Sequence, residues 1–322
     1  MKEKSLVCLC GGVGGVKLLF GLASFLPPSR LAAIANVGDD FTHFGFHISP
    51  DLDTVMYTLA GQVNTNTGWG RADESWQCMD GLRELGAETW FNLGDRDLAT
   101  HICRTNWLRE EATLSEVTTR LCRRMGVAHD IVPATDDLLR TVIETDQETL
   151  AFQHYFVREQ CRPSVKAIRI EGADKARPSP GAERWLSRED LGAVIICPSN
   201  PYLSIDPILA VPGIRSLVKA LEVPVIAVSP LIAGKALKGP TAKIMQELGV
   251  PLTASAIARH YADVLSAFVL DERDEAEAKM IEAMGIATLR TNILMVDDES
   301  KIRLGHEIVS FADRLSSNAI AR

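Results

Sequence analysis

The first 26 residues constrain the fold more than any other part of the chain. The run from Ser5, "SLVCLCGGVGGVKLLFGLASFL", starts as a short apolar strand, turns at the glycines of 11–15 and continues with the apolar spacing of a helix. A strand that passes through a glycine turn into a helix is the basic unit of α/β folds. The sequence therefore predicts a βα unit at the start of the chain.

Three further apolar runs predict buried strands. They are "LAAIANV" from Leu31, "AVIIC" over Ala193–Cys197 and "VPVIAVS" over Val223–Ser229, the last preceded by a predicted helix around Ile214–Leu221. Strands that are apolar on both faces are typical of parallel sheets covered by helices on both sides. The repeated order predicts an α/β fold, Rossmann-like, with a mostly parallel, doubly wound sheet.

We expect residues 1–322 to form a single domain with one main core. Between about 71 and 128 the pattern changes to helices with few strand signals, which predicts a smaller helical subdomain within the Rossmann-like core. The stretch "LRTVIETDQETLAFQHYFVRE" alternates around an Asp-Gln-Glu turn and predicts an antiparallel hairpin. The stretch "ADKARPSPGAE" predicts a surface loop.

Charge and apolar pattern argue against two kinds of partner. The formal charge of −8 disfavours nucleic acid, because proteins that bind it usually carry a basic surplus. No apolar run approaches the about 18 residues of a membrane helix, and the start lacks the apolar region of a signal peptide. We therefore expect a cytoplasmic protein without membrane contact, whose seven scattered cysteines are reduced.

The glycine turn is a candidate anion site, although it matches no complete fingerprint. Gly12 and Gly14 fit the first two positions of GxGxxG, but Lys17 occupies the third, and the GxxxxGK[ST] pattern of P-loops is absent. What remains is a backbone turn ahead of a helix, where Gly12, Gly14 and Gly15 would seat a phosphate or a nucleotide. The alternative is that these glycines only make a tight turn.

Four loops directly follow predicted strands and should meet at one edge of the sheet. They are the glycine turn, "NVGDD", "PSNP" and "SPLIAGKALKGPT". Ligands of open parallel sheets bind at this edge, so Ser199, Asn200 and Lys235 or Lys238 are candidate nucleotide ligands. Pro240 is placed as the first residue of a helix whose N-terminus would attract phosphate. For either lysine the alternative is a solvated surface charge.

Residues 36–61 contain two acidic pairs and neither Lys nor Arg. Asp39 and Asp40 follow a predicted strand, whereas Asp51 and Asp53 open a predicted helix. Capping of that helix would explain one of the four carboxylates. Oxygen ligands beside a phosphate site favour Mg²⁺, which takes one or two carboxylates together with phosphate and water.

Thr100 and Arg104 lie four residues apart in a predicted helix that starts near Asp97, so they share one face. On that face they would hold a phosphate or a ring carbonyl of a ligand. The alternative is an exposed i,i+4 pair. His43, His47 and His101 show no HxxH or HExxH spacing, so zinc is not expected.

Taken together and in order, these segments resemble the CofD/FbiA family, the phospholactate transferases of coenzyme F-420 biosynthesis. The matching stretches, from about Leu6 to Asp274, are "GGVGGVKLL", "NVGDD", "PDLDTVMYTLAG", "GWG", "LGDRDLATH", "PSNPYLSIDPIL", "PGIR", "VSPLIAGKALKGP" and "DERD". The resemblance implies a Rossmann-like core, a homodimer and a Mg²⁺-dependent transfer. In that reaction the ribityl hydroxyl of the deazaflavin Fo attacks the phosphoryl group of a GDP-linked three-carbon acid and releases GMP.

The resemblance also implies roles for individual residues. Asp39 and Asp51 become metal ligands and, with Asp53, the catalytic residues. Asp53 is placed at the Fo hydroxyl as orienter or base, with Asp40 nearby. Further candidates for the Fo side are Asn92, Arg96, Thr100 and Arg104. The transferred acid, which is phospholactate, phosphoenolpyruvate or 3-phosphoglycerate, differs among members of the family.

Two other classes of protein compete with the transferase. A related group of cytoplasmic, non-enzymatic regulators of carbon metabolism and cell shape is similar in the glycine turn and the sheet, and binds nucleotide-sugars. Those regulators would need neither "GDRDLATH" nor "PDLDT", and both stretches are present here. A Rossmann oxidoreductase would need the complete glycine fingerprint, which this sequence lacks.

Overall fold

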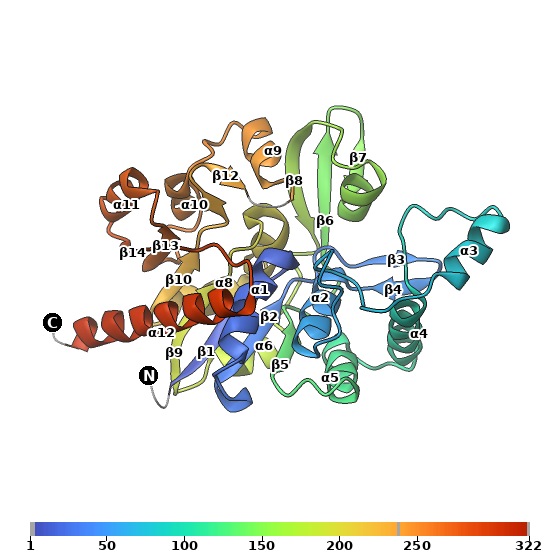
Figure 1. Cartoon of the computed structure of the whole chain (residues 1–322), viewed down its shortest axis with the longest axis horizontal. Helices are drawn as coiled ribbons and strands as arrows, with labels where there is room; N and C mark the ends of the chain where they lie inside the picture. Colours follow the sequence, from blue (N-terminus) through green and yellow to red (C-terminus); the bar gives the residue numbers. More distant parts are fainter. Residues whose placement is uncertain (1–3, 237–238, 321–322) are drawn as a thin grey trace.

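A seven-stranded sheet, parallel throughout, forms the centre of the molecule (Figure 1). The computed structural model describes residues 4–236 and 239–320. In their order across the sheet the strands are β14 (Ala287–Thr291), β13 (Ala267–Asp271), β10 (Val225–Val228), β9 (Leu191–Ile196), β1 (Ser5–Cys10), β2 (Leu31–Ala35) and β5 (Asp130–Pro133). The predicted Rossmann-like α/β fold is confirmed.

The strand order reverses in the middle of this sheet. From β1 the chain moves outward through β2 to β5, and it later returns to β9, beside β1, and moves the other way through β10, β13 and β14. The connections that leave β1 and β9 therefore run in opposite directions along the sheet. In open parallel sheets ligands bind at such a reversal, outside the carboxyl ends of the strands.

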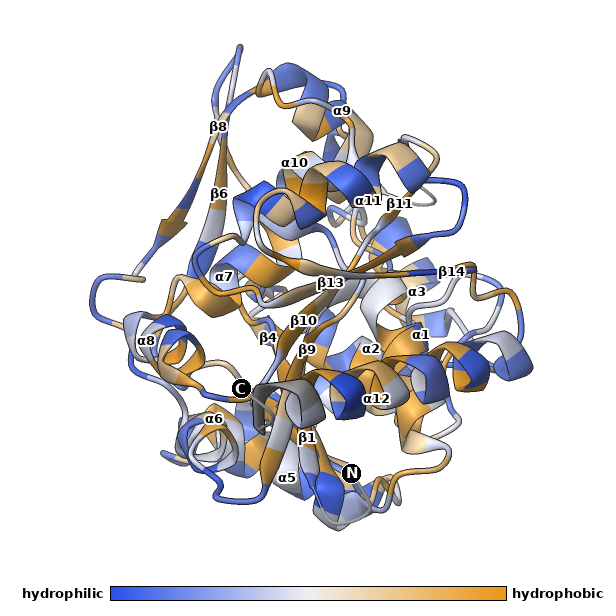
Figure 2. Ribbon diagram, turned by 90° about the vertical axis from the view of Figure 1, so that its left-hand side faces the viewer, coloured by the Kyte–Doolittle hydropathy of each residue, from blue (hydrophilic) through white to orange (hydrophobic). Residues whose placement is uncertain are grey.

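Helices cover both faces of the sheet. They are α1 (Gly12–Ala23), α2 (Pro50–Leu59), α3 (Gln77–Glu84), α4 (Asp95–Arg109), α5 (Leu114–Arg124), α6 (Pro180–Leu186), α7 (Asp206–Leu209), α8 (Pro212–Ala220), α9 (Thr241–Glu247), α10 (Ala254–His260), α11 (Glu275–Glu282) and α12 (Asp298–Ile320). Figures 1 and 2 together show α1, α2 and α12 on one face and α6 and α8 on the other. Every residue of β1, β2 and β9 is consequently buried.

The helices α3, α4 and α5 fall within the predicted helical part of the chain, on the right of Figure 1. The hairpin of β3 (Phe41–His43) and β4 (Phe46–Ile48) packs on α4. A second, small apolar core of Phe41, Ile48, Met79 and Leu93 lies in this region. The buried face of α5 belongs instead to the main core.

A separate three-stranded antiparallel sheet rises beside α9 (Figure 1). Its strands are β6 (Arg140–Thr145), β7 (Thr149–Ala151) and β8 (Val165–Glu171). The predicted hairpin is correct for β6 and β7 but wrong beyond them, because His154–Arg158 forms a π-helical turn that buries Tyr155. Side-chain alternation did not reveal β8, which pairs with β6 across the hairpin.

Two smaller features complete the description. The predicted surface loop ends early, because Ser179 accepts a hydrogen bond from the Ala182 backbone and α6 begins at Pro180. A short hairpin, β11 (Leu231–Ile232) with β12 (Lys235–Ala236), follows β10. No helix in the described part of the chain has both the length and the apolarity of a membrane span.

Candidate functional site

Hydrogen bonds join the four loops that follow β1, β2, β9 and β10. The Ser199 hydroxyl, after β9, donates to the Gly11 carbonyl at 2.6 Å, and the Asn36 amide, after β2, donates to the Cys10 carbonyl at 3.1 Å. The Asn200 side chain donates to the Thr241 hydroxyl, at the start of α9, at 3.0 Å. The four loops therefore meet at one edge of the sheet, as the sequence predicts.

The glycine segment differs from the predicted turn. Helix α1 already begins at Gly12, so Gly12, Gly14 and Gly15 lie in its first turn and not ahead of it. The chain reverses at Gly11, which is extended, and Gly12, whose φ is +63°. Because strand and helix are separated by one residue, the first amides of α1 lie directly at the sheet edge.

Gly14 and Gly15 allow α1 to approach the loop after β9. A Cβ atom on Gly14 would lie 2.5 Å from the Pro198 carbonyl oxygen, and a Cβ on Gly15 would overlap the Ser199 hydroxyl. These two glycines therefore have a packing role that is independent of any ligand. The predicted nucleotide role of the segment rests on the helix N-terminus that this packing positions.

We expect Gly14→Ala to lower the free energy of unfolding by about 1–3 kcal/mol, because the added methyl overlaps a backbone carbonyl that cannot rotate away. Gly81→Ala in α3 is the matched control. A Cβ at Gly81 has no neighbour within 4 Å, and helix propensity alone should stabilise that variant by about 1 kcal/mol. Urea unfolding measures both, and an equal gain in the two variants would disprove the close approach.

The carboxylates of Asp39 and Asp51 lie on either side of one amide. The Asn36 side chain donates to Asp39 Oδ1 at 3.2 Å and to Asp51 Oδ2 at 3.0 Å. The Gly12 amide donates to the other oxygen of Asp51 at 2.6 Å, and Gln153 Nε2 lies 3.4 Å from Asp39 Oδ2. Asp39 and Asp51 are therefore brought together beside the first residue of α1.

Both carboxyl groups are buried, and neither forms an ion pair with a cation among the described residues. Burial raises the pKa of Asp51 to about 6, although the Asn36 and Gly12 hydrogen bonds lower it. Burial and the charges of Asp51 and Asp40 also raise the pKa of Asp39. Two buried oxygen ligands with excess negative charge fit a hard divalent cation such as Mg²⁺.

The capping explanation for Asp51 and Asp53 is wrong. The N-cap of α2 is Ser49, and the two aspartates lie in the first helical turn behind Pro50. Because they are two residues apart on a helix, they point in different directions. Asp51 contacts α1 and Asp53 contacts α4, so the start of α2 lies between two groups of side chains.

Arg104 and Thr100 share a face of α4, as predicted, but the face is buried and the exposed alternative is wrong. Thr100 is 3% exposed and Arg104 is 1% exposed. Two nitrogens of the Arg104 guanidinium donate to the two oxygens of Asp53, one of them at 3.0 Å. The Arg104 side chain therefore holds Asp53 in place, which the sequence did not reveal.

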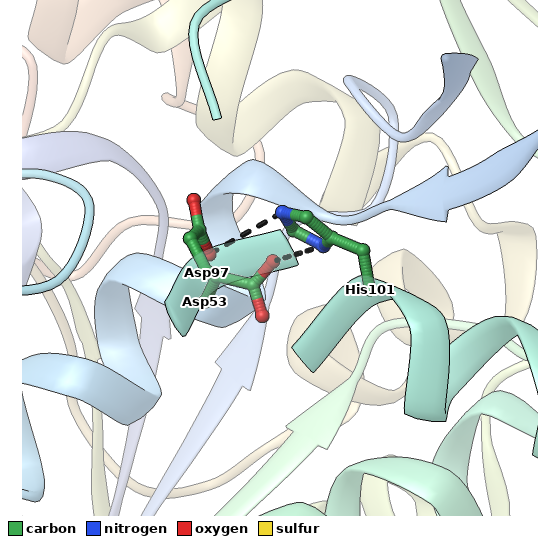
Figure 3. Close-up of side chains that lie close together, drawn as sticks. All are labelled: Asp53, Asp97 and His101. Carbon is green, nitrogen blue, oxygen red and sulfur yellow. Dashed lines mark ion pairs between the residues drawn. The ribbon is translucent and has the colours of Figure 1, made fainter. Parts of the chain in front are cut away.

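His101 lies between two carboxylates, as Figure 3 shows. Its ring nitrogens are 3.7 Å from Asp53 Oδ2 and 3.3 Å from Asp97 Oδ1, and the Tyr57 hydroxyl donates to Asp97 at 2.6 Å. One ligand atom from each of Asp53, Asp97 and His101 lies within 4.8 Å of the other two, close enough for a metal ion. Because the Arg104 cation already balances the negative charge of Asp53, these side chains fit a structural hydrogen-bond network better than a metal site. The Asp97–His101 spacing of four residues was the available sequence signal.

The remaining predicted residues are more exposed. Asn92 and Arg96 are exposed, and Asn92 lines a small cavity of about 160 Å³ with Asp97, Trp69 and Trp76. The two tryptophans were not predicted as site residues, although Trp69 stands in the "GWG" stretch. This cavity connects the surface around Asn92 to the buried network of Asp97.

The fourth loop gives a mixed result. Lys235 is exposed at the end of the short β11–β12 hairpin, in agreement with a solvated surface charge. Lys238 lies outside the described residues. Pro240 is the N-cap of α9, one residue ahead of the predicted position, so the helix begins at Thr241. The Thr241 hydroxyl, already bonded to Asn200, lies at this helix N-terminus.

The fold and this edge define a Rossmann-like α/β protein with a buried acid pair beside a helix N-terminus, at the reversal of the strand order. The family model described as 2-phospho-L-lactate transferase CofD matches residues 6–309. The chain therefore belongs to the CofD family of transferases, and the predicted resemblance is confirmed.

Relatives cover nearly the whole chain. A phosphoenolpyruvate transferase of Kitasatospora aureofaciens is 39% identical, over 96% of this chain and 98% of that protein. A phosphoenolpyruvate transferase of Nocardia farcinica is 41% identical, over 89% and 90%. A 2-phospho-L-lactate transferase of Methanosarcina mazei is 36% identical, over 94% and 99%.

Solved structures support the fold alone. A crystal structure of a Bacillus halodurans protein superposes with a TM-score of 0.61 at 15% identity, covering 95% of this chain and 99% of that one. A second crystal structure, described as a member of the UPF0052 family from the same organism, gives 0.60 at 16% identity.

Proposed function

We propose that this chain transfers a phospho-three-carbon-acid group from its GDP-linked form to the deazaflavin Fo and releases GMP, in coenzyme F-420 biosynthesis. Membership of the CofD family supports the transferase class, and the relatives carry the names phosphoenolpyruvate transferase and 2-phospho-L-lactate transferase. The observation that carries the proposal is the buried pair of Asp39 and Asp51 beside the Gly12 amide.

The pair would hold Mg²⁺ through the oxygens of Asp39 and Asp51. When bound there, the ion supplies charge neutralisation on the diphosphate. The N-terminus of α1 lies beside the pair, and its dipole supports the same negative charge. Asn36 fixes the two carboxylates relative to each other, because its single amide nitrogen donates to both.

Asp53 is proposed to orient the attacking ribityl hydroxyl. Arg104 fixes the direction of its carboxylate through two hydrogen bonds, and the cavity lined by Asn92 and Asp97 lies on the same side of α2. An aspartate is a weak base, so alignment of the hydroxyl with the phosphoryl group should contribute more than proton removal. The start of α2 would then lie between the part of the site that binds the nucleotide, next to Asp51, and the part that binds Fo, next to Asp53.

Mass spectrometry of products tests the proposal and identifies the acid. Fo is incubated with Mg²⁺ and, separately, with the GDP-linked forms of phospholactate, phosphoenolpyruvate and 3-phosphoglycerate. One Fo adduct together with GMP is expected. No adduct from any donor, with folded protein that also leaves Fo fluorescence unchanged, would disprove the transfer and favour the nucleotide-sugar regulator. Light scattering of the same sample measures whether the protein is the homodimer that the resemblance implies.

Asn200→Ala is expected to weaken GDP binding by about 1–3 kcal/mol, the usual cost of leaving buried polar groups unpaired. The Asn200 side chain accepts from the Tyr202 and Leu203 amides and donates to Thr241, so it holds two loops of the proposed nucleotide side together. Calorimetry with GDP and with Fo measures the effect, which should be absent for Fo. Asn106→Ala, at an exposed position of α4, is the control. Equal GDP affinity in both variants would remove this loop from the site.

A further inference from the structure

The base of the three-stranded sheet is attached to the acidic loop. The Thr141 amide, at the start of β6, donates to the Gly38 carbonyl, next to Asp39, at 2.5 Å. Gln153, which follows β7, reaches Asp39 from the same side. In Figure 1 β6 accordingly rises from the place where β2 ends. The first residue of β6, Arg140, is therefore held beside the acid pair.

Arg140 carries a charge that no described carboxylate neutralises in an ion pair. Its side chain is half-buried, and its guanidinium donates to the Leu139 carbonyl at 2.7 Å. Arg169, on the neighbouring strand β8, is different, because it pairs with Glu144 and with Glu171. Burial and the nearby carboxylates raise the pKa of Asp39, and the Arg140 charge opposes them. Arg140 is thus close enough to act on Asp39 while keeping donors for a ligand.

The order of strands along the sheet edge indicates which part of the donor lies near Arg140. The loops after β9 and β10, with Asn200 and Thr241, form the proposed nucleoside side. The N-terminus of α1, after β1, would face the diphosphate, and the acid pair after β2 would face the phosphoryl group being transferred. One step further along the edge, past Asp39, comes Arg140.

We propose that Arg140 binds the carboxylate of the three-carbon acid in the GDP-linked donor. This inference rests on the proposed function. A guanidinium matches a carboxylate with two parallel hydrogen bonds, which a lysine ammonium cannot reproduce. All three candidate acids carry a carboxylate, so Arg140 contributes to recognition of the acid end without choosing among the acids. The role is binding and alignment, because the acid must be held while the Fo hydroxyl attacks its phosphoryl group.

The test compares Arg140→Gln and Arg140→Lys with Arg169→Gln, the control on the adjacent strand. Steady-state transfer to Fo gives KM and kcat/KM for the donor that the unmodified protein uses, and calorimetry gives the affinities for GDP and for Fo. We expect Arg140→Gln to raise the donor KM and lower kcat/KM about 10- to 100-fold, in line with the strength of charge-assisted hydrogen bonds. GDP and Fo, which lack the acid, should bind as before. Arg140→Lys should recover part of the loss, and Arg169→Gln should show none.

Three results would overturn the inference. A donor KM unchanged in Arg140→Gln would show that the guanidinium does not touch the donor. An equal loss of affinity for GDP would place it on the diphosphate instead. If a thermal melt shows that Arg140→Gln does not fold, the inference is tested with Arg140→Lys instead. An unchanged donor KM in Arg140→Lys would reject the two parallel hydrogen bonds between the guanidinium and the donor carboxylate. Absence of transfer by the unmodified protein is a separate result, because it rejects the proposed function before any variant is compared.

Discussion

Asp39→Asn is expected to abolish transfer and, at the same time, to stabilise the metal-free protein. Loss of one anionic ligand should lower the rate by about a thousandfold, because charge stabilisation by a bound metal is worth several kcal/mol. Stability should change in the opposite direction, since the substitution removes one of two neighbouring carboxylates that are buried without a cation. Single-turnover transfer and urea unfolding in EDTA measure the two effects.

The pH dependence of stability gives a second readout of this pair. The pKa of Asp51 is about 6 in the folded protein and near 3.8 when the chain is unfolded, so the folded protein binds more protons between these values. The free energy of unfolding of the metal-free protein should therefore fall as pH rises from about 4 to about 7. Asp39→Asn should flatten this decline, because it removes a second buried carboxyl group whose pKa is raised in the folded protein.

Added Mg²⁺ should reverse the decline at pH 7.5 in the unmodified protein and have little effect below pH 5, where the ligands are protonated. The control is Asp80→Asn, an exposed carboxylate on α3 that should change neither activity nor the effect of Mg²⁺. Full transfer by the unmodified protein in excess EDTA would reject the metal assignment. So would a melting temperature of Asp39→Asn that Mg²⁺ raises as much as it raises that of the unmodified protein.

Arg104→Met is expected to be the most destabilising single change at the site, at about 3–5 kcal/mol. It leaves the Asp53 carboxylate buried without the guanidinium that donates to both of its oxygens. Burial already raises the pKa of Asp53 against the opposing charge of Arg104, so this pKa should rise further in the variant. The matched control is Arg83→Met, which breaks the exposed pair with Asp80 and should cost about 1 kcal/mol or less.

The ion pair between Arg104 and Asp53 also determines which variants can test the role of Asp53. Asp53→Ala would leave Arg104 unpaired in the interior, so its loss of activity would mix folding with chemistry. Asp53→Asn keeps the shape, and the double variant Asp53→Asn/Arg104→Met should cost less stability than the two single variants added together. If Asp53 orients the hydroxyl, single-turnover transfer by Asp53→Asn falls strongly at unchanged donor affinity. An unchanged rate in this folded variant would assign Asp53 to structure alone.

Local patterns in the sequence were sufficient for the fold class and for the edge at which the site lies. Apolar runs of five to seven residues around β1, β2, β9 and β10 indicated strands with both faces covered, and such strands occur in parallel sheets. Parallel strands place their carboxyl ends on one edge, so the loops that hold Asp39 and Asn200 could be grouped before any contact was known. The order of segments also carried the family resemblance, which the comparisons confirmed.

Only the tertiary structure decided which charges are paired and which are available to a ligand. Arg104 is 51 residues from Asp53, and Arg140 is about 100 residues from Asp39. Whether such groups meet depends on how helices and sheets pack, and periodicity within one element contains no information about that packing. The spacing of Thr100 and Arg104 predicted a shared face correctly but could not tell a ligand-binding face from a buried one. For the same reason an arginine at the start of a predicted strand gave no sign that it lies beside the acid pair.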